Sequence, residues 1–581
     1  MNDETKSKSN FAPPTKRDIL RAIASFSKTE KAVFWIIAAL SMIFALATIQ
    51  GVSRFFMVEV PTYGGSFVEG IVGTPRFINP VLAISEADRD GTMLVYSGLL
   101  RKTASGELIP DLASKYDISK DGLTYTFTLR DNIFFHNGTP VTTDDIEFTV
   151  LKAKDPTIKS PKRPDWEGVS VQKIDGKTIS FILKQPYVQF LENTTIGILP
   201  KNLWKEVPTE QFSFSDLNLK GIGSGPYAVD AVTKNSGGIP VSISFSSFKK
   251  FALGNPYVSF IDFNFYSNEE ELLSGLKSGS VDNINAIMPE EAENLKDRGI
   301  AIRKYALPRV YGVFLNQSSA PVFTDKSVRE ALNEAIDRKK IVDSVLYGYG
   351  TPIYGPIPER MDESLSQTEE KEKQEELAGR AKKILENSGW KIDESDGVMK
   401  KKSKKETSIL SFSISTADKP ELRAVAAMLK EDWGKIGARV EVKIFELGDF
   451  NQNIIRPRKY DSILFGEVIS KDSDPYAFWH SSQRNDPGLN IALYANSKVD
   501  KILESARVTL DTKERAKKYA QFEDAIKEDI PAVFIYSPDF IYVMSPGLSG
   551  VEIGELNVPA ERFLNVYKWY KETDFIWKLF N

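Results

Sequence analysis

The sequence predicts a mixed α/β protein that follows one membrane-spanning helix near the N-terminus. Three observations predict this class: an uncharged run at residues 32–53, the alternating apolar pattern of a half-buried strand at 124–130, and the apolar stripe of a helix at 323–348. With 581 residues, 41% apolar and 27% charged, the chain has a globular composition and is long enough for two or three domains.

The uncharged run is long enough to cross a bilayer. At about 1.5 Å per residue, Ala32 to Ser53 form a helix of roughly 33 Å, close to the hydrocarbon thickness of a membrane. Residues 1–31 carry more Lys and Arg than Asp and Glu, so the positive-inside rule leaves them in the cytoplasm. We therefore expect a 1–31 cytoplasmic basic tail, a 32–53 single-pass anchor in the cell membrane, and an extracytoplasmic remainder.

Cleavage of this segment as a signal peptide is the alternative. Ala45-Leu46-Ala47 has the small-x-small pattern of a signal-peptidase site, which would leave Thr48 at the mature N-terminus. The long n-region and the long apolar run favour the uncleaved anchor. The chain has no cysteine, so attachment through a lipoprotein cysteine is excluded and the exported part folds without disulfides.

Strand and helix patterns alternate after the span. Period-two alternation or short β-branched and aromatic runs predict strands at 124–130, 178–184, 241–245, 261–265, 439–444 and 533–536. The helix pattern at 323–348 has Ser327 and Glu330 spaced as a capping box, and Gly348 as its stop. A break near Asp337 is expected.

Two charged segments complete the pattern. Residues 369–388 combine many charges with a narrow apolar stripe, which predicts a surface helix. The basic run at 400–406 is typical of a solvated hairpin tip rather than of a partner site.

Charge and histidine content exclude several classes of function. The net charge is −4, and because the tail is basic the remainder is more acidic still, which argues against a nucleic-acid partner. The two histidines, His136 and His480, and the absence of cysteine argue against a zinc, copper or nickel site and against Ser-His-Asp or Cys-His catalysis. We expect no cofactor, no metal and no enzyme activity.

A small-ligand site is indicated by aromatic residues beside Asp and Gly. Phe465-Gly466-Glu467 reads as a strand, and residues 472–479 (DSDPYAFW) follow it with carboxylates and aromatic side chains. Such a strand end offers backbone donors, charges and apolar walls to a ligand. For Asp474, helix capping ahead of Pro475 is an equally good interpretation. His480 would line this site or cap a helix.

An ordered set of motifs closely resembles the family 5 extracellular solute-binding proteins, the peptide, dipeptide and nickel receptors of ABC importers. The resemblance covers about residues 63–560. Its motifs are Asn79-Pro80, Tyr96–Leu100, Pro110–Ala113, Asp121–Arg130, Phe135–Thr142, Gly223–Tyr227, Val328–Leu332, Ala335–Arg338, Tyr460-Asp461, Asp474-Pro475 and Glu528–Pro531.

The resemblance implies a bilobed, periplasmic-binding-protein-like type II fold with an extra third subdomain and two hinge crossings. The ligand would be enclosed between the lobes, and closure would be a population shift. The implied boundaries are lobe I at 61–90, 205–305 and 500–560, the extra subdomain at 91–204, lobe II at 306–499, and an aromatic and basic C-terminal segment at 561–581.

The resemblance also implies ligand-binding residues. An extended peptide would pair with the strand Gly466, Glu467 and Val468 and with the early segment Ser85 and Glu86, so that main-chain hydrogen bonds supply affinity. Either Asp472 or Asp474 would meet the α-amino group of the peptide. Tyr311 and Trp479 are weaker pocket candidates.

A monomeric receptor that delivers peptides to an ABC permease and its ATPase subunits follows from this resemblance. The N-terminal helix would replace the missing lipid as the tether to the membrane. Alternatives are a non-peptide solute such as an oligosaccharide, or a peptide chaperone or sensor without transport. The aromatic residues of 567–580 would pack on the edge of a lobe or touch a membrane surface.

Overall fold

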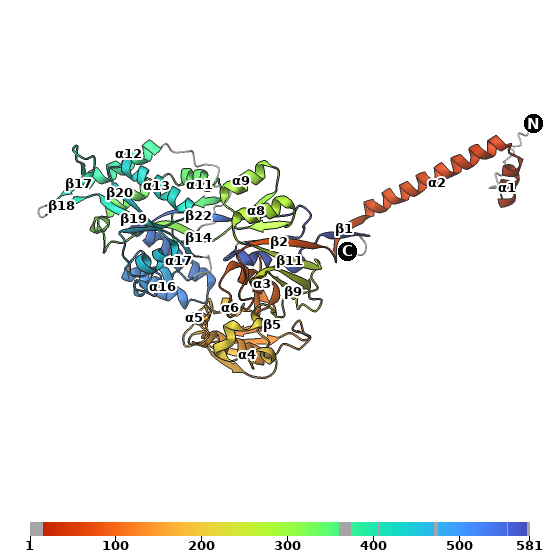
Figure 1. Ribbon diagram of the computed structural model, residues 1–581, viewed down its shortest axis with the longest axis horizontal. Helices are drawn as coiled ribbons and strands as arrows, with labels where there is room; N and C mark the ends of the chain where they lie inside the picture. The colour runs from red at the N-terminus through yellow and green to blue at the C-terminus, as the bar shows by residue number, and fades with distance from the viewer. Residues whose placement is uncertain (1–14, 359–373, 404–405, 470–473, 555, 578–581) are drawn as a thin grey trace, which may run out of the picture. The chain divides into compact units, whose positions relative to one another are not determined.

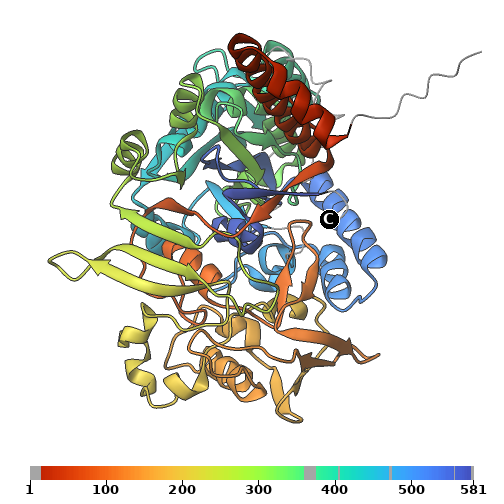
Figure 2. The same cartoon turned by 90° about the vertical axis from the view of Figure 1, so that its right-hand side faces the viewer.

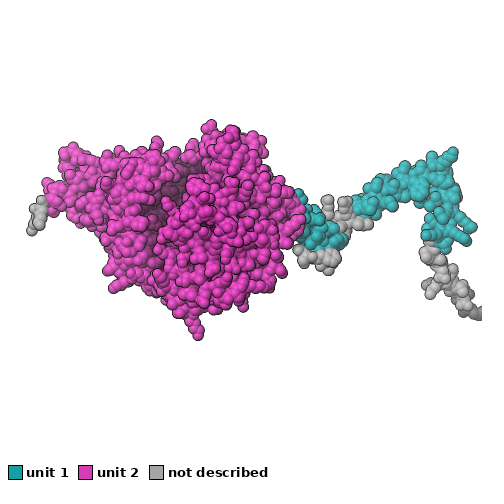
Figure 3. Space-filling view, turned by 60° about the horizontal axis from the view of Figure 1, so that its bottom comes forward, with its two compact units in different colours: residues 1–62, 572–581 teal, residues 63–571 magenta. Residues whose placement is uncertain are grey.

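The computed structural model describes residues 15–358, 374–403, 406–469, 474–554 and 556–577. The chain divides into two compact units, which Figure 3 distinguishes by colour. Unit 1 comprises residues 1–62 with 572–581, and unit 2 comprises residues 63–571.

Unit 1 contains the predicted membrane-spanning segment. After α1 (Lys16–Ser25), the helix α2 (Lys28–Phe56) runs without interruption through the uncharged stretch, and its Lys28–Thr48 part is apolar and long enough to span a bilayer (Figure 1). The strand β1 (Met57–Thr62) follows directly and pairs antiparallel with β23 (Glu572–Trp577). The first and last described strands of the chain therefore form one ribbon.

Unit 2 is built around one large mixed sheet. Along its main path the strands are β20 (Arg439–Phe445), β19 (Ser411–Ala417), β21 (Ser462–Val468), β14 (Arg309–Leu315), β22 (Ala532–Val543), β12 (Asn283–Asn285), β2 (Ser66–Val72), β11 (Phe260–Tyr266), β10 (Pro240–Ser247) and β9 (Tyr227–Lys234). Two further strands, β13 (Ile302–Ala306) and β15 (Gly350–Pro352), also pair with β22. The β9–β10 hairpin projects from the end of this sheet (Figure 2).

The long strand β22 belongs to two lobes. Its residues 532–536 pair with β14, and its residues 539–543 pair with β13. One large apolar core lies on the β14 side and another on the β2 side. The chain thus crosses between the lobes twice, once between β13 and β14 and once within β22, and the predicted bilobed α/β fold is confirmed.

The extra subdomain forms a small sheet of its own. Its strands are β5 (Ala113–Ile118), β6 (Thr124–Leu129), β8 (Thr178–Ile182) and β7 (Ser170–Lys173), and α4 (Thr143–Lys154) contacts β7. Trp166, Phe181 and Phe190 pack against one another in its core, with Trp166 and Phe190 edge-on. The predicted strands at 124–130 and 178–184 are confirmed as β6 and β8.

The lobe boundaries differ from those implied by the resemblance at the C-terminal side. Residues 500–560 were expected in lobe I, but α16 (Ser497–Arg507) and α17 (Thr512–Asp529) bury Leu503 and Phe522 in the core of lobe II. The physical reason is that α17 leads straight into the half of β22 that pairs with β14. Trp569, expected in a separate C-terminal segment, is buried in the core of lobe I.

The predicted helix at 323–348 is two helices, as expected from the break near Asp337. They are α10 (Lys326–Glu334) and α11 (Arg338–Val345), and Asp337 caps the second by accepting from Lys340 N at 2.8 Å. The predicted capping box is wrong, because Asp325 is the N-cap of α10. Its Oδ1 accepts from Ser327 N at 3.0 Å, and its Oδ2 is held by Trp390 Nε1 at 3.1 Å.

The other predicted segments are found at their expected places. The surface helix is α12 (Gln374–Asn387), with residues 369–373 outside the described part. The basic run joins the antiparallel strands β17 (Met399–Lys402) and β18 (Thr407–Ile409), as expected of a hairpin, with residues 404–405 outside the described part.

A buried ionic cluster ties lobe I together. Arg562 is 0% exposed and donates through Nη2 to Glu69 Oε1 at 2.9 Å and to Asp90 Oδ2 at 2.7 Å. The Tyr542 hydroxyl donates to Glu69 Oε2 at 2.8 Å. These residues come from β2, α3 (Glu86–Val95), β22 and the turn at 559–563, so one guanidinium connects four segments. A buried charge needs such partners to offset its lost hydration.

Candidate functional site

A cavity of about 280 Å³ lies where the two lobes meet at the crossing strands, and we call it the inner cavity. Unit 2 is also visibly hollowed on the face seen in Figure 3. Its lining includes charged and aromatic residues from both lobes and from the crossing strands, namely Glu86, Arg309, Tyr311, Glu421, Tyr536 and Asp539. Two of them, Glu86 and Tyr311, were predicted as ligand-binding residues.

Tyr311 forms an aromatic wall of the inner cavity. Its ring stacks on Tyr536 across the β14–β22 pair, with centroids 4.9 Å apart and planes 10° apart. On the other side Tyr311 is paired with Gly466 of β21, and a Cβ added at Gly466 would lie 2.6 Å from the ring. The ring therefore occupies the space that only a glycine leaves open.

Charged groups of the inner cavity have unfilled hydrogen-bonding capacity. The Arg309 guanidinium is a partner of the Tyr311 hydroxyl, but its buried Nε has no hydrogen-bond partner among the described residues. Glu86 accepts from Arg89 Nη1 through Oε1 at 2.8 Å, whereas its Oε2 is buried and has no partner within the described part of the chain. Burial raises the pKa of Glu86.

Asp539 is a third charged group of this cavity. Burial raises its pKa to about 6, and the Lys304 ammonium at 3.8 Å opposes the shift only partly. Unsatisfied buried polar groups are costly in a folded protein. An arginine and three carboxyl groups around one small cavity therefore suit a ligand that carries charges of its own.

The predicted ligand-pairing strand has one free edge, and its other edge pairs with Arg309 and Tyr311 of the inner cavity. Along one side, β14 pairs with β21 over its whole length, 462–468. Along the other side, β19 pairs only with 462–464, and among the described residues no strand pairs with Gly466–Val468 there. Val468 is 48% exposed, while the Glu467 side chain is buried, which raises its pKa. A free strand edge can accept an extended peptide.

The early segment contributes through Glu86 rather than Ser85. Ser85 is the N-cap of α3, where its N–H donates to Asp88 Oδ2 at 3.0 Å and its carbonyl accepts from Arg89 N at 3.1 Å. The main-chain groups of Ser85 are thus already used at the helix start. Of the predicted pair, only Glu86 lines the inner cavity.

Asp474 lies in a different place, beside a cavity of about 570 Å³ between lobe II and the extra subdomain. Its Oδ1 accepts from Tyr476 N at 3.1 Å at the start of α15 (Tyr476–Trp479), and its Oδ2 accepts from Arg507 Nε at 2.7 Å. Burial raises its pKa, opposed by Arg507. Its helix-start role fits the capping interpretation, and its charge is already paired.

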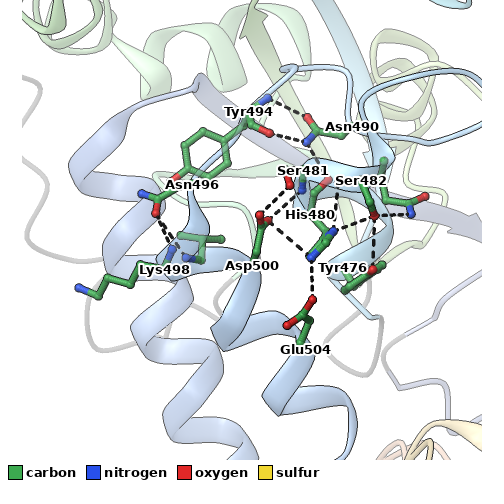
Figure 4. Close-up of polar contacts among 12 residues, drawn as sticks. Tyr476, His480, Ser481, Ser482, Asn490, Tyr494, Asn496, Lys498, Asp500 and Glu504 are labelled. Carbon is green, nitrogen blue, oxygen red and sulfur yellow. Dashed lines mark hydrogen bonds and ion pairs between the residues drawn. The ribbon is translucent and has the colours of Figure 1, made fainter. Parts of the chain in front are cut away.

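His480 follows α15 and belongs to the group of polar side chains shown in Figure 4. Its ring stacks on Tyr476 at 4.0 Å and accepts from Ser482 N through Nδ1 at 3.1 Å, which caps the short turn at 481–483. Its Nε2 faces Asp500 at 3.7 Å and Glu504 at 3.4 Å. Of the two expected roles, helix capping is the one that the contacts support.

Two remaining site predictions have different outcomes. Trp479 is 1% exposed and packs on Phe314 and Phe534 in the core of lobe II, so it supports the fold and lines none of the cavities described above. The reason is that α15 turns its indole inward. Asp472 lies outside the described residues.

Sequence reasoning missed four residues of the inner cavity, Arg309, Glu421, Tyr536 and Asp539. Tyr536 ends the predicted strand at 533–536, and Arg309 begins the strand that also carries Tyr311. Their positions at strand ends were the signal in the sequence that could have identified these two residues. Nothing in the local sequence brings Glu421, at the start of α13 (Pro420–Lys435), to the same cavity.

Comparison with known proteins places these features in context. Residues 107–488, more than half of the chain, match the bacterial extracellular solute-binding proteins, family 5 (middle). The chain is 29% identical over 525 residues to the oligopeptide-binding protein AppA of Bacillus subtilis, covering 88% of this chain and 92% of that protein. It is 26% identical over 500 residues to the probable D,D-dipeptide-binding periplasmic protein DdpA of Escherichia coli, covering 83% and 90%.

Solved structures share the fold. The crystal structure of NikZ from Campylobacter jejuni in complex with Ni(L-His) is 28% identical, covers 87% of this chain and 99% of its own, and superposes with a TM-score of 0.67. AppA from Bacillus subtilis in complex with a nonapeptide is 26% identical, covers 88% and 100%, and has a TM-score of 0.65.

Proposed function

The chain belongs to the family 5 bacterial extracellular solute-binding proteins, and on that premise we propose that it is a receptor that encloses peptides between its two lobes and delivers them to an ABC importer. The observation that carries the proposal is the free edge of β21 at Gly466–Val468, whose other edge pairs with Arg309 and Tyr311 of the inner cavity. Relatives whose names denote oligopeptide and dipeptide binding support the same ligand class.

Main-chain pairing would hold the peptide, and charges would orient it. An extended peptide added to the edge of β21 gains hydrogen bonds that do not depend on its side chains. The unfilled Nε of Arg309 is a donor for a ligand carboxylate, and the unfilled Oε2 of Glu86 is an acceptor for a ligand N–H. This charged lining favours a peptide over a neutral oligosaccharide.

For the α-ammonium of the peptide, Asp472 is the better of the two predicted partners. The Asp474 carboxylate already accepts from Arg507 and from a helix-start N–H, so an ammonium there would have to compete with a guanidinium at 2.7 Å. A buried ammonium needs a fixed negative partner. We therefore assign the ammonium to Asp472.

The proposed location is the outer face of the cell membrane, with α2 kept as an anchor and residues 1–31 in the cytoplasm. The support is the apolar Lys28–Thr48 helix and the basic tail before it. Intact-mass measurement of the membrane-extracted protein tests this proposal, because a mature N-terminus at Thr48 would identify a cleaved signal peptide instead.

The family consists of substrate-binding proteins of ABC transporters and is not an enzyme family. We propose that the receptor acts as a monomer and releases its peptide unchanged. Mass spectrometry of a peptide library after incubation with the protein checks this, since cleavage beyond one turnover per receptor would contradict it.

The ligand assignment is tested by calorimetric titration of Asp472→Asn and Asp474→Asn with tetra-alanine and its N-acetyl form. Asp472→Asn leaves the ammonium unpaired and should lower affinity by about 3–5 kcal/mol, or a hundred- to a few-thousand-fold. Asp474→Asn should change affinity by less than about tenfold, or roughly 1.4 kcal/mol.

N-acetylated peptide is the control. Because it has no ammonium, it should bind the unmutated receptor weakly. The Asp472→Asn change should then lower its affinity little further. Equal affinity for the free and acetylated peptides would show that no amino-terminal clamp exists, and a non-peptide solute would become the better assignment.

A further inference from the structure

The ribbon formed by β1 and β23 carries most of its large apolar side chains in one half, which also holds the charged Glu59. Antiparallel pairing sets Trp577 opposite Met57, Ile576 opposite Val58 and Phe575 opposite Glu59. The other three rungs hold the polar start of β23, Glu572–Asp574, opposite Val60–Thr62. The aromatic end of β23 therefore lies at the end of the ribbon that joins α2.

This end of the ribbon is tied by the chain to the end of the apolar helix. No residue separates α2, which ends at Phe56, from β1, which begins at Met57. The uncharged run ends at Ser53, so Met57 lies about 6 Å further along the helix axis. The headgroup layer on each side of a bilayer is roughly 5–8 Å thick. If α2 spans the bilayer, the first rungs of the ribbon lie in that layer.

The aromatic side chains of these rungs suit the same layer. Phe575 and Trp577 are two residues apart in β23, so they point to the same face of the ribbon, and they are 57% and 42% exposed. Tryptophan is enriched at membrane interfaces because its ring is apolar and its N–H can hydrogen-bond in the headgroup region. A two-stranded ribbon is only marginally stable in water, so burial of these rings would also stabilise it.

We propose that Phe575 and Trp577 bind the outer interface of the bilayer that α2 crosses, so that the C-terminal strand forms a second membrane contact. This inference rests on the proposed membrane anchor. The partner is the lipid headgroup and upper acyl region. Glu572 and Asp574, which anionic lipids would repel, lie in the half of the ribbon further from α2.

The experiment uses the complete chain in phosphatidylcholine and phosphatidylglycerol vesicles. Because the chain has no cysteine, one introduced cysteine carries one environment-sensitive fluorophore. The test variants are Phe575→Cys and Trp577→Cys, and the matched control is Glu572→Cys, which lies about 17 Å from residue 577 along the same strand. Quenching by headgroup-labelled nitroxide lipid is measured for each.

Quenching by the nitroxide lipid should be at least about twofold stronger for the labels at 575 and 577 than for the label at 572. The reason is that 575 and 577 would lie in the interfacial layer and 572 would lie outside it. Adding Trp577→Ser to the chain labelled at 575 should reduce that difference. Equal quenching of the labels at 577 and 572 in lipid overturns the proposal. This is also the result expected if the two rings bind a protein partner instead of lipid.

A label at Met42→Cys separates this inference from the anchor on which it rests. Met42 lies in α2 and is exposed, so a spanning helix places it among the acyl chains, where a nitroxide attached deep in the lipid should quench it. Absence of quenching at 42 contradicts the anchor itself. Quenching at 42 with no difference between 577 and 572 contradicts only the aromatic contact.

Discussion

Two arginines, one in the core of lobe I and one in the inner cavity, are treated in opposite ways by the fold. Each of the three guanidinium nitrogens of Arg562 has a carboxylate partner on Glu69 or Asp90. Within the described part of the chain, Arg309 Nε and the Oε2 of the nearby Glu86 have no hydrogen-bond partner. Charged groups whose hydrogen bonds are satisfied within the protein hold a lobe together. Charged groups at a cavity with unsatisfied hydrogen-bonding atoms can bind a ligand instead. This difference predicts which changes affect stability and which affect binding.

The largest effect is expected for Arg562→Met. Removing the guanidinium leaves Glu69 and Asp90 buried without their partner, which should lower the free energy of unfolding by about 3–5 kcal/mol. Urea unfolding measures it. The control is Arg423→Met, because Arg423 pairs with Asp418 at an exposed position and should contribute less than about 1 kcal/mol. Similar losses in both variants would contradict the role of the buried cluster.

The pH dependence of stability should reveal the charge at the inner cavity. Asp539 has an ordinary pKa of 3.8 when unfolded and about 6 when folded, so the folded state binds the proton more tightly. Its stabilising contribution is full below pH 3.8 and is lost as the pH rises through about 6, by up to about 3 kcal/mol.

Asp539→Asn isolates this contribution. The variant cannot ionise, so the difference in unfolding free energy between it and the unmutated protein should change between pH 4 and pH 7, in favour of the variant at pH 7. A constant difference across that range would show that Asp539 titrates normally.

Arg309→Met should lower affinity without lowering stability. Losing a charged hydrogen bond to a ligand carboxylate costs about 1.5–3 kcal/mol, or roughly ten- to 150-fold in affinity for tetra-alanine. The unfolding free energy should stay within about 0.5 kcal/mol, as expected away from the core. Arg303→Met, on the exposed part of the neighbouring β13, is the control. Equal affinities of the two variants would remove Arg309 from the site.

The smallest effect is expected from one added methyl group at Gly466. Gly466→Ala brings a Cβ to 2.6 Å from the Tyr311 ring, so the ring must move off its favoured position at about 0.5–1.5 kcal/mol. Gly434→Ala is the matched control, because nothing lies within 4 Å of its Cβ and a helical Gly→Ala change should stabilise by about 0.5–1 kcal/mol. The two changes should therefore shift the unfolding free energy measured in urea in opposite directions. Shifts in the same direction would contradict the packing of the Tyr311 ring over Gly466.

Features set by neighbouring residues could be predicted from the sequence. The strand patterns at 124–130 and 178–184 and the helix break at Asp337 agree with β6, β8 and the α10–α11 boundary. Each depends on side chains within a few positions of one another. The resemblance extended this to the bilobed fold, and two residues that it implied for ligand binding, Glu86 and Tyr311, line the inner cavity.

Features set by distant residues could not be predicted in this way. Asp325, which caps α10 in place of the predicted box, is also held by Trp390, 65 residues away. Helix α17 joined lobe II because the strand after it pairs with β14.

The inner cavity needs Glu86, Glu421 and Asp539 together, and the ribbon needs Trp577 beside Met57. Periodicity and charge order act along the chain, whereas the cavity forms only when burial of two apolar cores brings separate segments together, and the ribbon forms only when two distant strands pair.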